Sequence, residues 1–181
     1  MKRLIMTAMA VSAMSVALAA CETDTGAGPG PQTGPAYQPN SGGGPEAFRD
    51  SDFQWSTGSG SGVIVGSLNF KGPGGAYNCS DVVLAPETPW SRARMRVLYL
   101  STSQAAMPVD DVKGRTPPEH SADYARYARH ASCDAGGNFT FTGLPNGAWY
   151  VITVASPASG EKMAVMRRVT TSGGTLKVQL H

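Results

Sequence analysis

The chain has 181 residues, a length that suggests one domain with appendages. Fifteen basic and thirteen acidic residues give a formal net charge of +2 at pH 7, and Lys2 and Arg3 account for the whole excess. Without this short basic start the chain is close to neutral, which argues against nucleic acid or anionic lipid as an electrostatic partner. Beyond residue 20, no stretch is apolar enough to span a bilayer.

Residues 1–20 have the composition of a secretory signal peptide. The basic pair precedes an apolar stretch from Leu4 to Ala20, and small residues stand just before Cys21. A basic start, a short apolar core and small residues at the cleavage point are typical of secretion signals rather than of transmembrane helices. We therefore predict cleavage after Ala20.

The end of this segment, Leu18-Ala19-Ala20-Cys21, resembles the lipobox of bacterial lipoproteins. In that family the cysteine becomes the first mature residue and carries three acyl chains, which exceed the two signals that stable membrane anchoring needs. The resemblance implies lipidation of Cys21 and a membrane-anchored protein of the cell envelope. Glu22 follows the cysteine, which by the sorting rule of enteric bacteria favours the outer membrane of a Gram-negative bacterium. The alternative is an ordinary signal that leaves Cys21 as a free thiol.

Residues 21–52 are interpreted as a lipidated N-terminus and a tether. The stretch ETDTGAGPGPQTGPAYQPNSGGGPEAFRDS (22–51) is rich in Gly, Pro, Thr and Ser and has almost no aliphatic residue. Such a composition buries too little apolar surface to offset chain entropy, so we expect this segment to be disordered. About 30 residues of flexible chain have an r.m.s. reach on the order of 30 Å.

Residues 53–181 contain short apolar segments separated by Gly, Pro, Asn and Asp. This pattern is typical of an all-β sandwich or barrel. In the last of these segments, Leu176, Val178 and Leu180 share one face of the predicted strand. The pattern predicts seven strands, at 62–70, 81–86, 94–100, 138–143, 148–155, 163–170 and 175–180.

The clearest predicted element is a hairpin in the stretch CDAGGNFTFTGLPNGAWYVITVA (133–155). Phe139 and Phe141 point to one face of its first arm, and Asn146-Gly147 supplies the turn. The second arm is apolar on both faces, which predicts a central strand that is covered on both sides.

The motif DxGGxFxFxGLPxG (134–147) resembles a signature of carboxypeptidase regulatory-like domains, and the stretches 62–70, 81–88 and 169–180 match strands of that family. The resemblance covers roughly residues 60–181 and implies a seven-stranded Greek-key sandwich of the transthyretin (prealbumin) type. Residues 101–131 depart from it as a longer insertion, which we expect to be a short helix or irregular. Domains of this family are usually accessory or binding modules without catalytic residues, so the resemblance implies binding rather than catalysis.

Cys79 and Cys133 form an even pair once Cys21 is lipidated, and an exported protein meets oxidising conditions. Each precedes a predicted strand, so a disulfide across one end of the sandwich is expected if their Cα atoms come within about 7 Å. Closing the loop between Cys79 and Cys133 with a disulfide stabilises the fold by roughly 4 kcal/mol in the chain-entropy model. A metal pair or a redox couple is the alternative, although no Cys-x-x-Cys spacing favours either.

The insertion gathers the candidates for metal chemistry. Glu119, His120, Asp123 and His130 fall close together, and a helix over about 119–130 would place the two acidic residues on one face. The set matches no known ligand spacing and contains no HExxH, so we expect neither a metal nor a cofactor. A solvated helix with an acidic start and a basic end accounts for the same residues.

The same segment also carries a candidate binding surface, in which Tyr124, Arg126, Tyr127 and Arg129 alternate aromatic and cationic groups. These side chains could stack on sugar rings or pair with acidic glycans. Two tyrosines at i and i+3 could equally dock a helix on the sandwich, and we favour docking.

No motif supports catalysis. The run GSGSG (58–62) fits neither GxSxG nor GxGxxG, and it precedes a strand rather than joining a strand to a helix. We therefore expect a non-catalytic envelope module that binds a protein or a glycan. A structural subunit of an envelope complex is the alternative, and a small hydrolase or metal-dependent enzyme using residues 119–130 is a more distant one.

Overall fold

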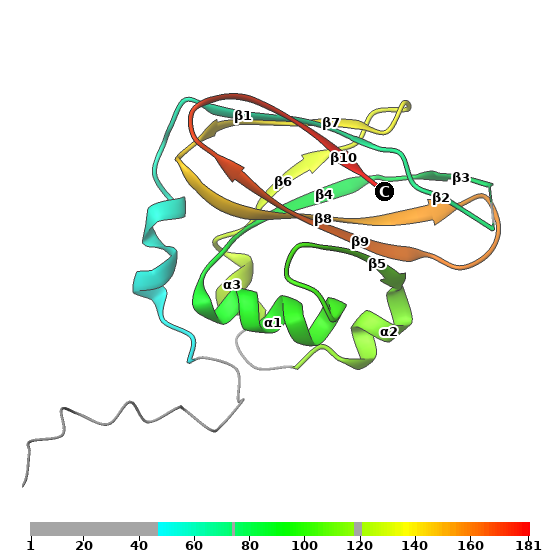
Figure 1. The fold of residues 1–181 in the computed structure, drawn as a ribbon, viewed down its shortest axis with the longest axis horizontal. Helices are drawn as coiled ribbons and strands as arrows, with labels where there is room; N and C mark the ends of the chain where they lie inside the picture. Colours follow the sequence, from blue (N-terminus) through cyan, green and yellow to red (C-terminus); the bar gives the residue numbers. More distant parts are fainter. Residues whose placement is uncertain (1–46, 74, 118–120) are drawn as a thin grey trace, which may run out of the picture. The chain divides into compact units, whose positions relative to one another are not determined.

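The structure is a computed structural model that describes residues 47–181 except Gly74 and residues 118–120. The signal peptide, Cys21 and most of the predicted tether therefore lie outside the described residues. Within the described part, two β-sheets pack against each other and helices cover one outer face (Figure 1). No helix in this part is long and apolar enough to cross a membrane.

The small sheet has three strands with β1 (Gly62–Leu68) at its centre. β1 pairs in parallel with β10 (Gly174–Leu180) and antiparallel with β7 (Asn138–Leu144). Side chains alternate between buried and exposed along β7 and in the last residues of β10, as the period-two pattern predicts.

The large sheet is built around β8 (Gly147–Pro157), which confirms the prediction of a central strand. Its other described strands are β2 (Lys71–Gly72), β3 (Gly75–Asn78), β4 (Asp81–Pro86), β5 (Gln104–Pro108), β6 (Arg129–Ser132) and β9 (Met163–Thr171). β4 and β3 pair with β8 along one edge and β9 pairs along the other. β6 extends the sheet from β4, β2 from β3, and β5 from β9.

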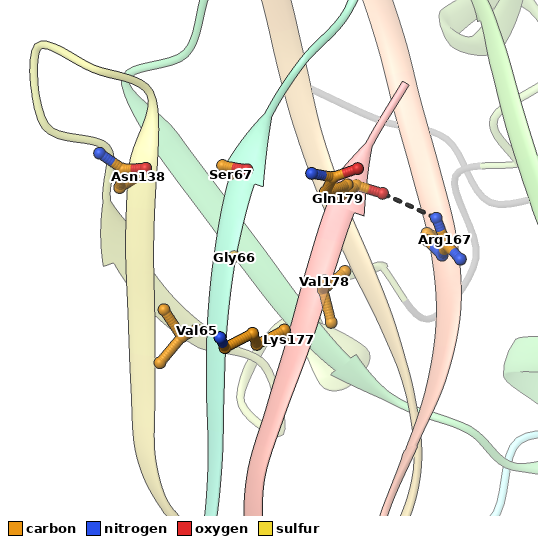
Figure 2. A pocket seen from close by; sticks show the side chains of 8 residues that line it. All are labelled: Val65, Gly66, Ser67, Asn138, Arg167, Lys177, Val178 and Gln179. Atoms are coloured by element: carbon orange, nitrogen blue, oxygen red, sulfur yellow. Dashed lines mark hydrogen bonds between the residues drawn. The ribbon is translucent and has the colours of Figure 1, made fainter.

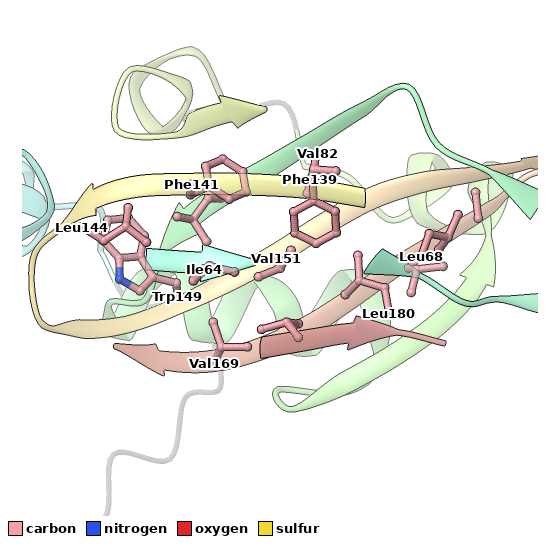
Figure 3. Close-up of a cluster of buried hydrophobic side chains, with 14 of the residues drawn as sticks. Ile64, Leu68, Val82, Phe139, Phe141, Leu144, Trp149, Val151, Val169 and Leu180 are labelled. Atoms are coloured by element: carbon pink, nitrogen blue, oxygen red, sulfur yellow. The ribbon is translucent and has the colours of Figure 1, made fainter. Parts of the chain in front are cut away.

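The main hydrophobic core lies between the two sheets (Figure 3). Trp149 and Val151 of β8 are fully buried there, and so is Ile64 of β1. Gly66 faces the ring of Phe139, and a Cβ at this position would lie 2.1 Å from the ring. The position therefore requires glycine so that the Phe139 ring can lie across β1.

A second core lies on the other face of the large sheet, beneath α1 (Pro89–Tyr99) and α2 (Val109–Gly114). Tyr150 of β8 is fully buried in it, together with Met95 and Leu98 of α1. Both faces of β8 are thus covered, one by the small sheet and one by helices, which explains why this strand is apolar on both sides.

Residues 94–100 were predicted as a strand, and the prediction is wrong because nearly all of them lie in α1. The start of the helix is fixed by a capping box, in which the Thr88 side chain accepts from Ser91 N–H and the Ser91 hydroxyl accepts from Thr88 N–H. Pro89 occupies the first turn, where its missing N–H costs nothing. The apolar residues repeat at helical spacing, so the buried face holds Trp90, Arg94, Met95, Leu98 and Tyr99.

The insertion at 101–131 is part of the fold rather than an irregular addition. It contributes β5, α2, α3 (Ser121–Ala125) and β6. The helix expected over about 119–130 is shorter than predicted, because α3 ends at Ala125 and the chain enters β6 at Arg129. Two sheets are confirmed, but ten strands lie within the described residues against the seven predicted.

Described residues that precede Phe53, the predicted start of the domain, already pack on it. The 3-10 helix η1 (Asp50–Ser56) packs on the domain, and Phe53 is fully buried. Phe48 precedes it and stacks on Phe53 with ring centroids 5.0 Å apart. Residues 47–52 were predicted as part of the tether. They contact the domain because the ring of Phe48 stacks on the buried ring of Phe53.

Cys79 and Cys133 form the predicted disulfide, with Cα atoms 5.7 Å apart. Directly after Cys133, the Asp134 carboxylate accepts hydrogen bonds from the backbone N–H groups of Gly136 and Asn138, each at 2.8 Å. The bonds from Asn138 lower the pKa of the Asp134 carboxyl. The motif at 134–147 thus begins with a turn that is closed by hydrogen bonds to the Asp134 side chain. Cys133, just before it, belongs to a structural disulfide.

Candidate functional site

The two tyrosines of the predicted binding surface lie in a closed aromatic cluster. Phe53 stacks on Tyr127 with centroids 4.8 Å apart and meets Tyr124 edge-on at 5.8 Å, and Trp90 covers Tyr124 at 5.1 Å. Tyr127 is 9% exposed, and the Tyr124 hydroxyl is buried with no hydrogen-bond partner among the described residues. Burial raises the pKa of Tyr124. Tyr127 is buried and Tyr124 is half-buried, so both rings pack the segment against the domain, as the docking interpretation predicts.

The two arginines of that surface hold η1 in place. Arg126 forms an ion pair with Asp50, which lowers the pKa of that carboxyl. Arg129 donates hydrogen bonds to the carbonyl oxygens of Ser56 and Gly58, each at 3.0 Å. The structure therefore brings all four predicted residues together, but as contacts that hold the N-terminal helix.

The predicted metal-ligand candidates do not converge in the described part of the chain. Glu119 and His120 lie outside the described residues. Asp123 lies in α3, whereas His130 lies in β6 and its Nδ1 is 3.2 Å from the carboxylate of Asp81 on the neighbouring β4. Among residues 47–73, 75–117 and 121–181, no group of three or more His, Cys, Asp or Glu side chains could hold a metal ion.

An open depression of about 590 Å³ lies at the opposite end of the sandwich, and we call it the end pocket. It is formed between the turn that joins β2 to β3 and the turn that joins β8 to β9. The lining residues are Phe70, Pro73, Tyr77, Ser159, Gly160, Glu161 and Met163.

Two aromatic rings shape the end pocket. Phe70 follows β1, and its ring meets Tyr77 of β3 edge-on with centroids 4.9 Å apart. Gly72 permits this arrangement, because a Cβ there would lie 2.9 Å from the Tyr77 hydroxyl. Tyr77 is held beside Pro157 at the end of β8. The rings and Met163 provide an apolar wall, and Ser159 and Glu161 provide hydrogen-bonding groups beside it.

A smaller depression of about 300 Å³ continues from the end pocket and shares Gly160 and Glu161 with it. Its other lining residues come from α2 and from Lys162. The backbone N–H of Val109 donates to the Lys162 carbonyl at 3.0 Å, which joins the start of α2 to the β8–β9 turn. An aromatic wall and a charged wall therefore meet at this turn.

A third depression, about 390 Å³ in volume, lies on the outer face of the small sheet, and we call it the sheet groove (Figure 2). Asn138, Ser67 and Gln179 form a row across β7, β1 and β10, because the strand register places them opposite one another. Arg167 of β9 reaches the same edge and donates to the Gln179 carbonyl at 2.8 Å.

Sequence reasoning missed both the end pocket and the sheet groove. The stretch NFKGPGGAYN (69–78) does carry a local signal, since a Gly- and Pro-rich turn stands between two aromatic residues. Nothing in the sequence indicates that this turn would lie beside residues 159–163, because the two segments meet only through the pairing of β3 with β8.

No protein-family model and no curated protein matches the chain. Among solved structures, the fold is similar to a crystal structure from Pseudomonas aeruginosa described as a "putative carbohydrate binding protein". The two chains are 25% identical with a TM-score of 0.54, and the match covers 74% of this chain and 96% of the other. This likeness is consistent with a binding role for the domain.

Proposed function

We propose that the chain is a lipid-anchored, non-catalytic module that binds a saccharide in the bacterial cell envelope. The end pocket is the observation that carries this proposal. A sugar ring has a C–H face that packs on aromatic side chains and hydroxyl groups that need hydrogen-bond partners. The half-buried ring of Phe70, which packs edge-on against buried Tyr77, offers the first kind of contact, and Ser159 and Glu161 offer the second. The likeness to a carbohydrate-binding candidate of similar fold supports the same assignment.

The position of the end pocket suits an anchored protein. Trp55 of η1 meets Trp149 near the start of β8 at 4.8 Å, whereas Tyr77 pairs with Pro157 at the end of that strand. At about 3.3 Å per residue, Trp149 and Pro157 are on the order of 25 Å apart along β8. Strand β3, which carries Tyr77 of the end pocket, therefore lies at the end of the large sheet away from η1 (Figure 1).

The anchor itself is proposed from the lipobox resemblance, with Cys21 as the lipidated residue and the outer membrane as the destination. Membership of the carboxypeptidase regulatory-like domains, with their transthyretin-like topology, is likewise proposed. It is supported by the motif at 134–147 and by the two packed sheets.

Saccharide binding is tested with the mature chain carrying Cys21→Ser, screened on an array of envelope and plant polysaccharides and then titrated with the best ligand. Phe70→Ala should weaken binding about tenfold, which corresponds to about 1.4 kcal/mol of lost stacking. Phe48→Ala is the matched control, because it removes a partly buried ring at the other end of the sandwich and should leave the affinity unchanged.

The proposal is overturned if no saccharide gives saturable binding, or if both variants weaken binding equally. Recovery of one protein partner at a constant ratio, without saccharide binding, would show a structural subunit of an envelope complex instead. Cleavage of a bound saccharide would show an enzyme.

The anchor is tested separately by fractionating cells and measuring the intact mass. The parent protein should be found in the outer membrane with the added mass of three acyl chains, whereas Cys21→Ser should leave the membrane fraction. If both proteins stay equally firmly in the membrane, the lipid anchor is refuted while the saccharide site is unaffected.

A further inference from the structure

The sheet groove is shaped by differences in side-chain length between the strands on the outer face of the small sheet. The central strand β1 presents the short side chains of Val65 and Ser67 on this face. The register places Lys177 of β10 beside Val65, and Asn138 and Gln179 on either side of Ser67. Short residues in the middle and longer ones on the flanking strands form a trough that runs along β1 (Figure 2).

The lining residues carry only positive charge, from Lys177 and Arg167. Within the described residues, the Arg167 guanidinium makes one hydrogen bond, to the Gln179 carbonyl, so its other N–H groups remain available to a ligand. Asp134 contacts Asn138 at the rim, but its oxygens accept the hydrogen bonds of its own turn. Two cations without an acidic lining residue favour an anionic ligand.

The neutral part of the groove favours a saccharide over a lipid surface. Ser67 and Gln179 present hydroxyl and amide groups, which pair with hydroxyl-rich ligands. Among the lining residues, one large apolar side chain is exposed, that of Val65, which is 40% exposed. One valine is too small an apolar surface to insert into a bilayer.

We propose that the sheet groove is a second binding site, which takes the acidic residues of a carboxylated polysaccharide lying along β1. The carboxylate groups pair with Lys177 and Arg167, and the sugar hydroxyls contact Ser67, Gln179 and Asn138. The sheet groove and the end pocket share no lining residue. This second site can therefore fail while the proposed function stands, and the reverse also holds.

The experiment titrates polygalacturonate, a carboxylated polysaccharide, into the mature chain carrying Cys21→Ser at low and at physiological ionic strength. Neutral dextran is the uncharged comparison. Lys177→Gln should weaken binding of polygalacturonate about fivefold to tenfold, and Lys177→Glu should weaken it further. Arg96→Gln is the matched control, because it removes an exposed positive charge on α1, away from both proposed sites, and should leave the affinity unchanged. The effect of Lys177→Gln should shrink as salt is added.

Three results would overturn the proposal. The chain could fail to bind polygalacturonate, or Lys177→Gln could weaken the binding of neutral dextran as much as that of polygalacturonate. Lys177→Gln and Arg96→Gln could weaken binding equally, which would show nonspecific attraction. Vesicles containing anionic phospholipid could compete with polygalacturonate at equal charge concentration, which would show a membrane-binding face. Circular dichroism and thermal unfolding of each variant ensure that lost binding is not lost fold.

Discussion

The two ends of the sandwich both gather aromatic side chains, but one end is closed and the other is open. Near η1, the rings of Phe53, Trp90, Tyr124 and Tyr127 pack on one another under the helix. At the far end, Tyr77 is buried as well, but Phe70 is only half-buried and its ring forms a wall of the end pocket. A cluster of aromatic residues in a sequence therefore does not locate a binding surface, because the element that covers the rings decides their role.

The two ends are also held by different interactions. The end near η1 depends on packed rings and on the contacts of Arg126 and Arg129 with the N-terminal helix. The far end has the Cys79–Cys133 disulfide and the hydrogen-bonded turn at Asp134. At this end a covalent link, rather than packed rings, fixes the strand ends.

The largest effect is expected from Phe53→Ala at the closed end. Phe53 is fully buried and contacts three other rings of the cluster, so its truncation should cost about 4 to 5 kcal/mol of unfolding free energy. Phe70→Ala at the open end should cost less than half as much, because that ring is only partly buried. Urea unfolding of both variants measures the difference. Equal losses would show that the two ends do not differ in packing.

Removal of the disulfide is expected to have the next largest effect. The linked residues are separated by 54 positions, so Cys79→Ala with Cys133→Ala should lower the unfolding free energy by about 4 kcal/mol in the chain-entropy model. We also expect weaker saccharide binding, because the strands that carry Tyr77 become less constrained. A doubly substituted chain with parental stability would show that the far end is held by noncovalent packing alone.

The smallest effect is expected from Tyr124→Phe. The Tyr124 hydroxyl is buried without a hydrogen-bond partner among the described residues, so its removal should leave the stability unchanged or raise it slightly. Tyr127→Phe should instead lower the stability slightly, because it removes a hydrogen bond of 3.0 Å to Asp50. Thermal unfolding of the pair measures the contrast. A clear loss from Tyr124→Phe would show that the hydroxyl has a partner and that the cluster is less tightly closed.

The sequence predicts those elements whose signal is local. The hairpin that holds Phe139 and Phe141 follows from period-two alternation around an Asn-Gly turn, and the disulfide follows from the cysteine count and its position before strands. The α1 helix was missed because residues 94–100 alternate as a strand does, while the capping signal at Thr88 lies upstream. The capping pattern and Pro89 are readable from the sequence, so this error was avoidable.

The candidate sites could not be predicted in the same way. The end pocket combines Phe70 and Tyr77 with Ser159 and Glu161, which are brought together only by tertiary pairing. β2 and β3 are also too short for their pattern to be distinguished from a loop. The tyrosine and arginine pattern at 124–129 was visible in the sequence, but its covering by η1 was not, since that segment has the composition of a tether.

The path of β1 has a mechanical consequence for an anchored protein. The chain leaves η1, enters β1 at Gly62 and runs along the small sheet to Phe70 at the end pocket. β1 pairs over its whole length with β10, from Gly62 to Leu68, and its hydrogen bonds lie across the strand direction. A pull between the N-terminal side and a ligand at Phe70 would run along the covalent backbone of β1, because the two points lie at opposite ends of this strand, and the pairing with β10 would keep the strand extended. The domain would then transmit the force to the proposed anchor as a stiff link.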